Sequence, residues 1–286
     1  MRNSAVEIRP VSAYSGAEIH GVDLAKPLAE QPYREIRNAL CEYGAVFFRD
    51  QNLTPEQLVT LGKRFGDLHV SKYIAKVPGN PDVAEVRKEP EQTRNTGGQW
   101  HTDHAYADMP PLGSILQAQE LPKTGGDTMF ANMCAAYDSL SEGIKKTLLT
   151  MRAHHAKSKA LDNSKLAPER RVDMAERSTI GRDNSERATI HPVTPRHPET
   201  GRRILFVNPT YTTRFEGWSV EESEPLLSYL YEHGKRPEYQ CRFHWEVGSI
   251  VFWDNRTSWH YALNDYHGER RLMHRVSVQG PGFDPS

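Results

Sequence analysis

The sequence predicts a mainly β protein, a sandwich or barrel with a few flanking helices. Short stretches with strand character recur in the second half, at Arg203–Val207, Tyr239–Trp245 and Ser249–Trp253. Turn residues such as Glu199-Thr200-Gly201 separate such stretches. Few helices alternate with them, which disfavours a doubly wound parallel sheet. Short strands joined by turns are typical of sandwiches and barrels.

The first half carries clear helix signals. Thr54-Pro55-Glu56 predicts a helix start, because a threonine cap, a proline at the first position and an early carboxylate all favour one. The apolar spacing that follows ends at Gly66. An earlier helix is expected over residues 32–43, stopping at Gly44, with a buried strand over residues 45–48 directly after it.

Further helices are expected later in the chain. Residues 137–151 predict one or two helices, and residues 219–233 predict another. The cap of the latter is Ser219 or Ser223. A start at Ser223 would leave Pro225 in the first turn, where proline is tolerated.

Size and composition indicate one ordinary globular domain spanning residues 1–286. The chain is 37% hydrophobic and 26% charged, with a formal net charge of -1. This balance gives no global attraction to nucleic acid or to an anionic membrane. Three scattered cysteines favour a reducing compartment, and neither a signal core nor a membrane-spanning run is seen. A cytoplasmic location is the expectation.

One segment, residues 157–187, is rich in charged residues and poor in large apolar ones. It predicts either a solvated surface insertion or a lid that closes over a substrate.

Chemistry is concentrated in the strand-like run 270–278. Alternate side chains of a strand share a face, so Arg271, Met273 and Arg275 point the same way. Buried guanidinium groups need anionic partners, and arginine binds carboxylates through a planar fork. The two arginines lie about 13 Å apart by strand rise, which favours two separate anion sites.

A histidine–carboxylate pair precedes this run by a long distance. His101-Thr102-Asp103 follows Trp100 and precedes an apolar strand at residues 114–116. Two similar patterns, His197-Pro198-Glu199 and His267-Gly268-Glu269, are expected in an exposed loop and a turn. His260 closes the run 253–260. Together with His101 and Asp103, it matches the two-histidine, one-carboxylate ligand set of non-haem Fe(II) oxygenases.

These residues resemble the taurine / 2,4-dichlorophenoxyacetate dioxygenase (TauD/TfdA) family of Fe(II)- and 2-oxoglutarate-dependent oxygenases. The strongest motifs are Trp100–Asp103, Gly125–Thr128, Phe206–Asn208 and Trp253–Arg256. The resemblance covers nearly the whole chain. It implies a double-stranded β-helix (a jelly roll, cupin-like) with flanking helices.

The resemblance also implies roles and co-substrates. Fe(II), 2-oxoglutarate and O2 would be used, with succinate and CO2 released as a small anionic substrate is hydroxylated. Homo-oligomers are common in the family. The implied site residues are His101, Asp103 and His260 for iron; Thr128, Arg271 and Trp253 for 2-oxoglutarate; and Arg275, His69, Tyr73, His104 and Tyr211 for the substrate.

Taurine itself is not the expected substrate. Taurine-specific members carry histidine, tyrosine, asparagine and phenylalanine where this chain has Ser71, Ile74, Gly97 and Tyr211. A different sulfonate, a sulfate ester, a phenoxy acid or a carboxylate is expected instead. Two alternatives stay open: a non-catalytic jelly-roll protein that binds a small acid or metal, and a zinc hydrolase. The hydrolase would leave Thr128 and Arg271 without a purpose.

Overall fold

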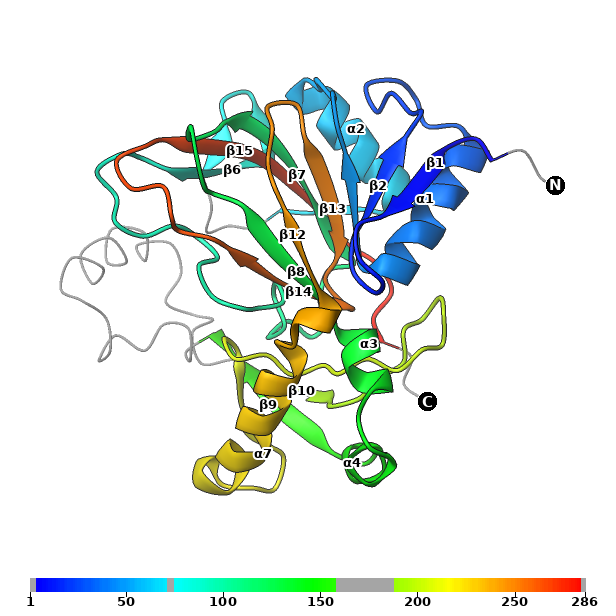
Figure 1. The fold of residues 1–286 in the computed structure, drawn as a ribbon, viewed down its shortest axis with the longest axis vertical. Coiled ribbons are helices and arrows are strands. Elements are labelled where there is room, and N and C mark those ends of the chain that lie inside the picture. The colour runs from blue at the N-terminus through cyan, green and yellow to red at the C-terminus, as the bar shows by residue number, and fades with distance from the viewer. Residues whose placement is uncertain (1–3, 71–74, 158–187, 284–286) are drawn as a thin grey trace.

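The computed structural model describes residues 4–70, 75–157 and 188–283. Tyr73 and nearly all of the charged segment 157–187 therefore lie outside the described residues. Two β-sheets face each other, and helices cover the outer side of the larger one (Figure 1).

The larger sheet has the strand order β1-β2-β3-β13-β7-β15-β6-β5, with β4 also paired to β15. Neighbouring strands are antiparallel, apart from the parallel pair β2–β3. The strands are β1 (Glu7–Pro10), β2 (Ala17–His20), β3 (Ala45–Phe48), β4 (Leu68–His69), β5 (Lys76–Val77), β6 (Asn80–Lys88), β7 (Gly113–Glu120), β13 (Ile250–Asp254) and β15 (Arg271–Val278).

The smaller sheet has the order β12-β8-β14. Its strands are β8 (Thr128–Asn132), β12 (Gln240–Phe243) and β14 (Ser258–Ala262). One apolar cluster joins the inner faces of both sheets, with Phe130 and Phe243 from the smaller sheet and Phe47, Trp253 and Met273 from the larger. Two facing antiparallel sheets around such a core form the predicted jelly roll, and the fold prediction is confirmed.

Helices α1 (Glu30–Tyr43) and α2 (Pro55–Phe65) pack on the outer face of the larger sheet. Alternation along β13 explains why every residue of this strand is buried. Val251 and Trp253 face the inner core, while Ile250 and Phe252 face the helices.

Both helix boundaries follow the predicted signals. Thr54 caps α2 with a capping box formed together with Gln57. Gly44 ends α1 in the left-handed conformation (φ 72°), where glycine carries no steric cost. A Cβ at Gly44 would also lie only 2.5 Å from Ser258 Oγ.

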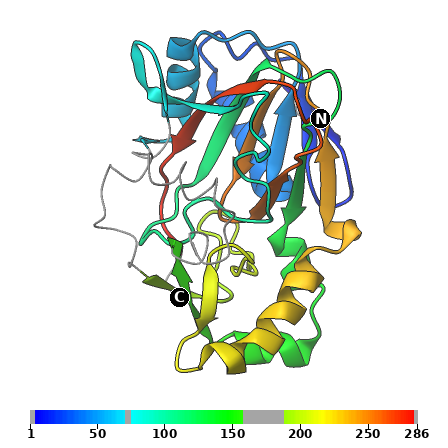
Figure 2. The ribbon, with the colours of Figure 1, turned by 90° about the vertical axis from the view of Figure 1, so that its left-hand side faces the viewer.

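A separate lobe lies below the facing sheets in Figures 1 and 2 and has its own apolar cluster. It contains the three-stranded sheet β10-β9-β11. Its elements are α3 (Met133–Asp138), α4 (Glu142–Leu148), β9 (Arg152–Ala156), β10 (Ala188–Pro192), β11 (Thr212–Phe215), α7 (Val220–Gly234) and the 3-10 turn η3 (Pro237–Tyr239).

The start of α7 lies at Ser219, so a start at Ser223 is wrong. Ser219 and Glu222 form a capping box that satisfies the backbone at this end. Pro225 therefore lies inside the helix. Its missing N–H costs one interior hydrogen bond, and the cap offsets part of that loss.

The strand expected over Arg203–Val207 is also absent; only an isolated bridge joins Arg203 to Arg196. The backbone of this buried segment bonds to irregular neighbours instead. Leu205 N–H donates to the Met133 carbonyl, and Phe206 N–H donates to the Val193 carbonyl. Tertiary hydrogen bonds have overridden the local strand preference.

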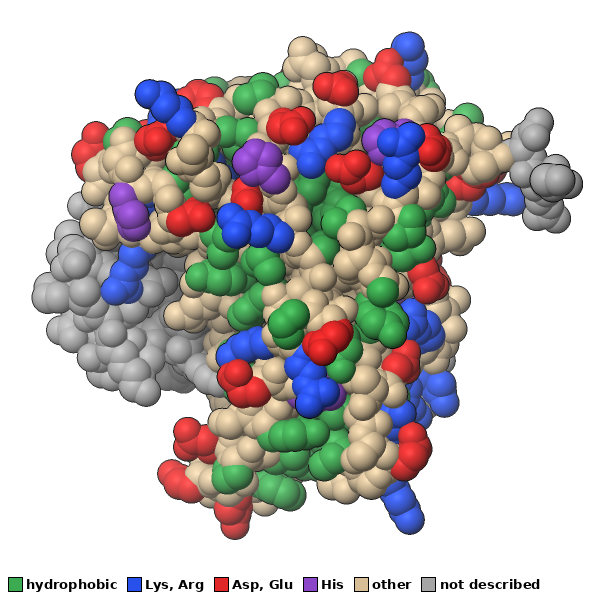
Figure 3. All heavy atoms as spheres, in the orientation of Figure 1, with side chains coloured by type: hydrophobic (Ala, Val, Ile, Leu, Met, Phe, Trp, Pro, Cys, Tyr) green, Lys and Arg blue, Asp and Glu red, His purple; other side chains and the backbone are tan. Residues whose placement is uncertain are grey.

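On the face drawn in Figure 3, basic and acidic side chains are interspersed. Among the described residues, no helix combines the length and apolar character needed to cross a bilayer.

Candidate active site

Two backbone segments bring His101 and His260 together. His260 lies on β14, and the segment carrying His101 pairs with this strand as an isolated antiparallel bridge. The His101 N–H donates to the His260 carbonyl at 3.1 Å, and the His260 N–H donates to the His101 carbonyl at 2.9 Å. Opposed residues on antiparallel segments share a face. The two imidazole centroids accordingly lie 4.1 Å apart.

Asp103 completes the cluster. Its carboxylate oxygens lie 3.6 Å from His101 Nε2 and 3.8 Å from His260 Nε2. The ligand atoms of the three residues all lie within 4.8 Å of one another, and all three side chains are buried. The structure thus gathers the three predicted metal ligands at one point.

The protonation states suit a divalent metal. His101 Nδ1 lies 2.7 Å from the Gln99 carbonyl oxygen, so its Nε2 lone pair faces Asp103. Burial, then His101 and Arg275, lower the pKa of His260 well below its usual value. Burial opposes ionisation of Asp103, but Arg275 and the two histidines hold the pKa of that carboxyl well below its usual range. Neutral imidazoles and an ionised carboxylate are the forms that bind metal.

Arg275 lies directly behind this cluster. Its NH2 group donates to Asp103 Oδ2 at 2.7 Å and to Ser114 Oγ at 2.9 Å. Its Nε has no hydrogen-bond partner among the described residues. Arg275 therefore fixes the carboxylate of Asp103 and keeps a donor for another acceptor.

Arg271 is also buried, but its hydrogen bonding differs from that of Arg275. Its side chain is 5% exposed, yet Nε and NH2 have no hydrogen-bond partner among the described residues. Thr128 lies nearby and accepts a 3.0 Å hydrogen bond from Trp245, whose ring centroid is 5.5 Å from the Arg271 guanidinium carbon. A Cβ at Gly126 would lie 3.3 Å from Arg271 Cδ. Unpaired buried guanidinium donors mark a place where an anion would fit.

The ring of Trp253 packs beside His260 of the metal cluster in a tilted arrangement. Its centroid lies 4.8 Å from that of His260. The indole N–H donates to Asn255 Oδ1 at 2.8 Å, so it is already used. Trp253 therefore shapes the site by packing and offers no hydrogen bond to a co-substrate.

A row of rings leads outward from the cluster. Centroids of His69 and His104 lie 4.9 Å apart, those of Tyr106 and Tyr211 lie 5.1 Å apart, and those of Tyr211 and His101 lie 6.4 Å apart. The Tyr106 hydroxyl lies 3.2 Å from His104 Nδ1 and links the two pairs. Three of these residues were predicted to bind substrate. Tyr106 was not, because nothing in its local sequence separates it from a packing tyrosine.

Lys76 is a second residue that the sequence did not reveal. Lys76 on β5 and Arg275 on β15 both pair with Ala84 on β6, so they lie in one row across the sheet. Burial and then Arg275 lower the pKa of His69, with Lys76 acting in the same direction. Arg275, His69 and Lys76 are thus close enough to interact electrostatically, and Arg275 and His69 also interact with Asp103.

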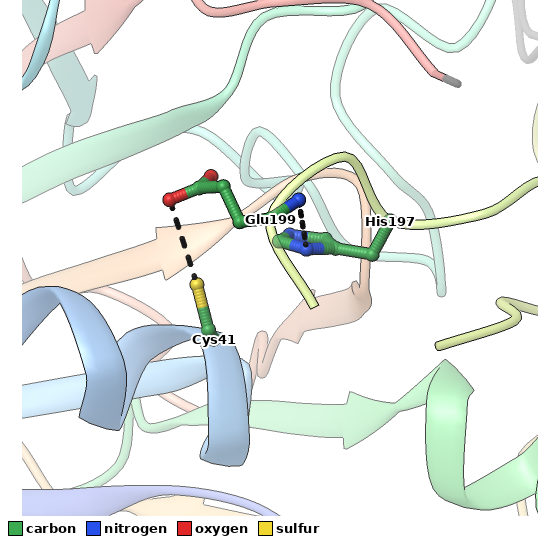
Figure 4. A group of neighbouring side chains, drawn as sticks. All are labelled: Cys41, His197 and Glu199. Carbon is green, nitrogen blue, oxygen red and sulfur yellow. Dashed lines mark hydrogen bonds between the residues drawn. The ribbon is translucent and has the colours of Figure 1, made fainter. Parts of the chain in front are cut away.

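A second cluster, Cys41, His197 and Glu199, also places metal-binding atoms close together (Figure 4). His197 was expected in an exposed loop, which is wrong, since its side chain is 1% exposed. Its Nε2 lies 3.2 Å from Asp254 Oδ2, and its Nδ1 accepts the N–H groups of Glu199 and Thr200. Both ring nitrogens are therefore occupied.

The other two members of this second cluster are equally unavailable. The Glu199 carboxylate forms ion pairs with Arg37 at 2.7 Å and with Arg256 at 2.9 Å. Burial, with Asp254 and Glu199 nearby, raises the pKa of the Cys41 thiol to about 12. The second cluster is a hydrogen-bonded charge network, not a metal site.

A jelly roll with a buried two-histidine, one-carboxylate cluster is the arrangement of the non-haem iron oxygenase class. Residues 7–277 match the family described as "Taurine catabolism dioxygenase TauD, TfdA family". The chain belongs to this family, and the prediction of a dioxygenase is confirmed.

Relatives within the family carry different substrate names. The chain is 32% identical to an alpha-ketoglutarate-dependent sulfate ester dioxygenase of Pseudomonas putida, over 96% of this chain and 90% of that protein. It is also 32% identical to a (S)-phenoxypropionate/alpha-ketoglutarate-dioxygenase of Sphingobium herbicidovorans, over 96% of each. The crystal structure of a taurine dioxygenase from Burkholderia xenovorans superposes with a TM-score of 0.79 at 34% identity, covering 98% of this chain and 92% of that one.

Proposed function

We propose that this chain is an Fe(II)- and 2-oxoglutarate-dependent dioxygenase that hydroxylates a small organic acid and releases succinate and CO2. One observation carries the proposal: a buried cluster with metal-ligand chemistry lies on the same framework as buried Arg271, whose Nε and NH2 have no hydrogen-bond partner among the described residues. A metal and an anionic co-substrate together account for both features.

His101, Asp103 and His260 would hold the iron. Nitrogen and carboxylate donors suit Fe(II), and the pKa shifts of His260 and Asp103 favour the neutral imidazole and the ionised carboxylate that bind metal. When bound, the ferrous ion supplies the redox chemistry that couples O2 to the oxidative decarboxylation of 2-oxoglutarate. Arg275 holds Asp103 in place, and the ring of Trp253 excludes water beside His260.

Arg271 and Thr128 would bind the far carboxylate of 2-oxoglutarate. Nε and NH2 of Arg271, which have no partner within the described part of the chain, offer the two-pronged donor pair that a carboxylate accepts. The Thr128 hydroxyl already accepts from Trp245, so its own proton is free to be donated to a third oxygen lone pair. This grip would orient the opposite end of the acid toward the metal cluster.

The substrate would enter along the row of rings. Its acidic group would meet Arg275, His69 and Lys76, and its carbon skeleton would lie against His104 and Tyr211. Tyr73 remains part of the proposed substrate site. Hydroxylation next to a heteroatom would give a product that collapses to a carbonyl compound.

The experiment is a panel of sulfonates, sulfate esters, phenoxy acids and carboxylates, scored by succinate release with Fe(II) and 2-oxoglutarate. At least one acid should stimulate succinate formation well above the substrate-free rate. If no acid raises succinate above that rate while the protein is folded, the proposal is wrong. Zinc-dependent cleavage of one of these acids without any succinate release would instead favour a hydrolase.

Compartment and assembly belong to the same proposal. The three cysteines are buried and free, as a reducing cytoplasm would keep them. A homo-oligomer, as is common in the family, is proposed on family membership alone.

A further inference from the structure

Two buried cations oppose each other across the β6–β15 ladder. Lys88 and Arg271 are direct partners in this antiparallel pair, so their side chains share a face of the sheet. Lys88 is 1% exposed. Both residues line one small pocket, whose other lining residues are Val86, Arg87, Asn95, Thr96 and Tyr266.

The cations next to Lys88 and Arg271 along the two strands have carboxylate partners. Arg87 and Arg270, each one position away, form ion pairs with Glu89 at 3.2 Å and 3.1 Å. Among the described residues, neither Lys88 nor Arg271 forms an ion pair with any carboxylate. Arg87 and Arg270 are thus neutralised by Glu89, whereas Lys88 and Arg271 have no carboxylate partner in the described part of the chain.

The contacts of Lys88 offset its charge only in part. Its Nζ donates to the Tyr266 carbonyl at 3.0 Å and lies 4.2 Å from the centroid of the Tyr266 ring. An ammonium carries three donors, and neither contact brings a negative charge. Burial lowers the pKa of Lys88 and also that of Arg271.

We propose that Lys88 is a specificity-determining residue: it is the second cation of the pocket that receives the far carboxylate of 2-oxoglutarate. The inference rests on the proposed function, since it assigns that carboxylate to Arg271. The inference adds that the pocket distinguishes 2-oxo acids by the charge of their tails. A 2-oxo acid with a carboxylate tail brings one negative charge to these two buried cations, whereas one with a neutral tail of similar length brings none.

The test measures binding without turnover. Protein loaded with Mn(II) is titrated by calorimetry with 2-oxoglutarate and, separately, with 2-oxopentanoate, whose tail is uncharged. The variants are Lys88→Met, Lys88→Arg, Arg271→Met and, as a matched control, Lys63→Met on the exposed side of α2. Thermal unfolding of each variant without ligand reports on folding.

Wild type and Lys63→Met should both prefer 2-oxoglutarate strongly. Lys88→Met should weaken 2-oxoglutarate binding by roughly tenfold to a hundredfold, the range of a hydrogen bond to a charged group. Binding of 2-oxopentanoate should stay the same. The preference ratio, defined as the affinity for 2-oxoglutarate divided by that for 2-oxopentanoate, therefore falls. Lys88→Arg, which keeps the charge, should retain most of the ratio even if Lys88→Met fails to fold.

Two results would overturn the inference. One is an unchanged preference ratio in Lys88→Met while Arg271→Met loses it, which would make Lys88 structural only. The other is an equal loss of binding of both acids in Lys88→Arg, together with a lower melting temperature of that variant. If Arg271→Met also keeps the ratio, the co-substrate pocket itself is misassigned and the proposed function fails at that point.

Discussion

In the part of the chain that the structure describes, two clusters combine histidine and acidic side chains, and one of these two has metal-binding capacity left. In His101–Asp103–His260 the imidazole Nε2 atoms face an ionised carboxylate. In Cys41–His197–Glu199 both nitrogens of His197 and both oxygens of Glu199 are engaged by the protein. The comparison teaches that proximity of ligand atoms is not sufficient. A site needs lone pairs that the fold has not already used.

The largest expected contrast comes from one histidine in each cluster. His101→Ala removes a proposed iron ligand and should lower substrate-dependent succinate release by at least about a thousandfold, since the chemistry depends on the metal. His197→Ala should keep its turnover per folded molecule. Succinate release, normalised to folded protein from circular dichroism, checks both. Full activity in His101→Ala would remove the distinction between the clusters.

Asp254 tests the structural role of the second cluster. Asp254→Asn leaves the buried Arg256 with only Glu199 as a counter-ion and should cost about 3–5 kcal/mol of stability. Urea unfolding measures this loss. An equally stable variant would show that the network is not what holds this region together.

Acid unfolding gives a second test of how Asp254 contributes to stability. Burial opposes ionisation of Asp254, but Arg256 and His197 depress its pKa below the ordinary value near 3.9. A depressed carboxyl pKa gives stability that is present above the unfolded value and is lost as pH falls through the folded value. Wild type should therefore lose stability below about pH 4. Asp254→Asn should lack that part of the pH dependence.

A smaller effect is expected at the substrate side of the first cluster. Arg275→Ala should raise the KM for the working acid by about tenfold or more, because a charge-assisted hydrogen bond is lost. Arg87→Ala, on the neighbouring strand and pairing with Glu85 and Glu89 at the surface, is the control and should change little. Unchanged kinetics in Arg275→Ala would exclude this arginine from substrate binding.

The smallest effect should be seen at Cys41. With its pKa raised to about 12, the thiol is almost wholly protonated at pH 8. Iodoacetamide should therefore leave it unmodified in the native protein and alkylate it in denaturant, as mass spectrometry would show. Rapid native alkylation would indicate a thiolate and reopen the second cluster as a metal site.

Local signals predicted those parts of the fold that local interactions decide. The ends of α1 and α2 followed from Gly44 and Thr54, because caps act within one turn. The strand expected at Arg203–Val207 failed because distant carbonyls captured its N–H groups. The burial of His197 was missed for the same reason, since its partner Asp254 is remote in sequence.

The residues of the site show the same difference between local signals and long-range contacts. His101 and Asp103 were found because they sit two residues apart, and His260 was found through its motif. Their backbone bridge could not be deduced from spacing. Lys88 and Lys76 were missed because strand register places them, through β6–β15 and β5–β6, beside residues that lie far along the chain.

Anaerobic binding of Fe(II), measured by equilibrium dialysis in the presence of 2-oxoglutarate, tests the central assignment most directly. Wild type and Glu199→Gln should each retain one ferrous ion per chain, and His101→Ala should retain none. An ion that survives in His101→Ala but is lost in Glu199→Gln would contradict the assignment.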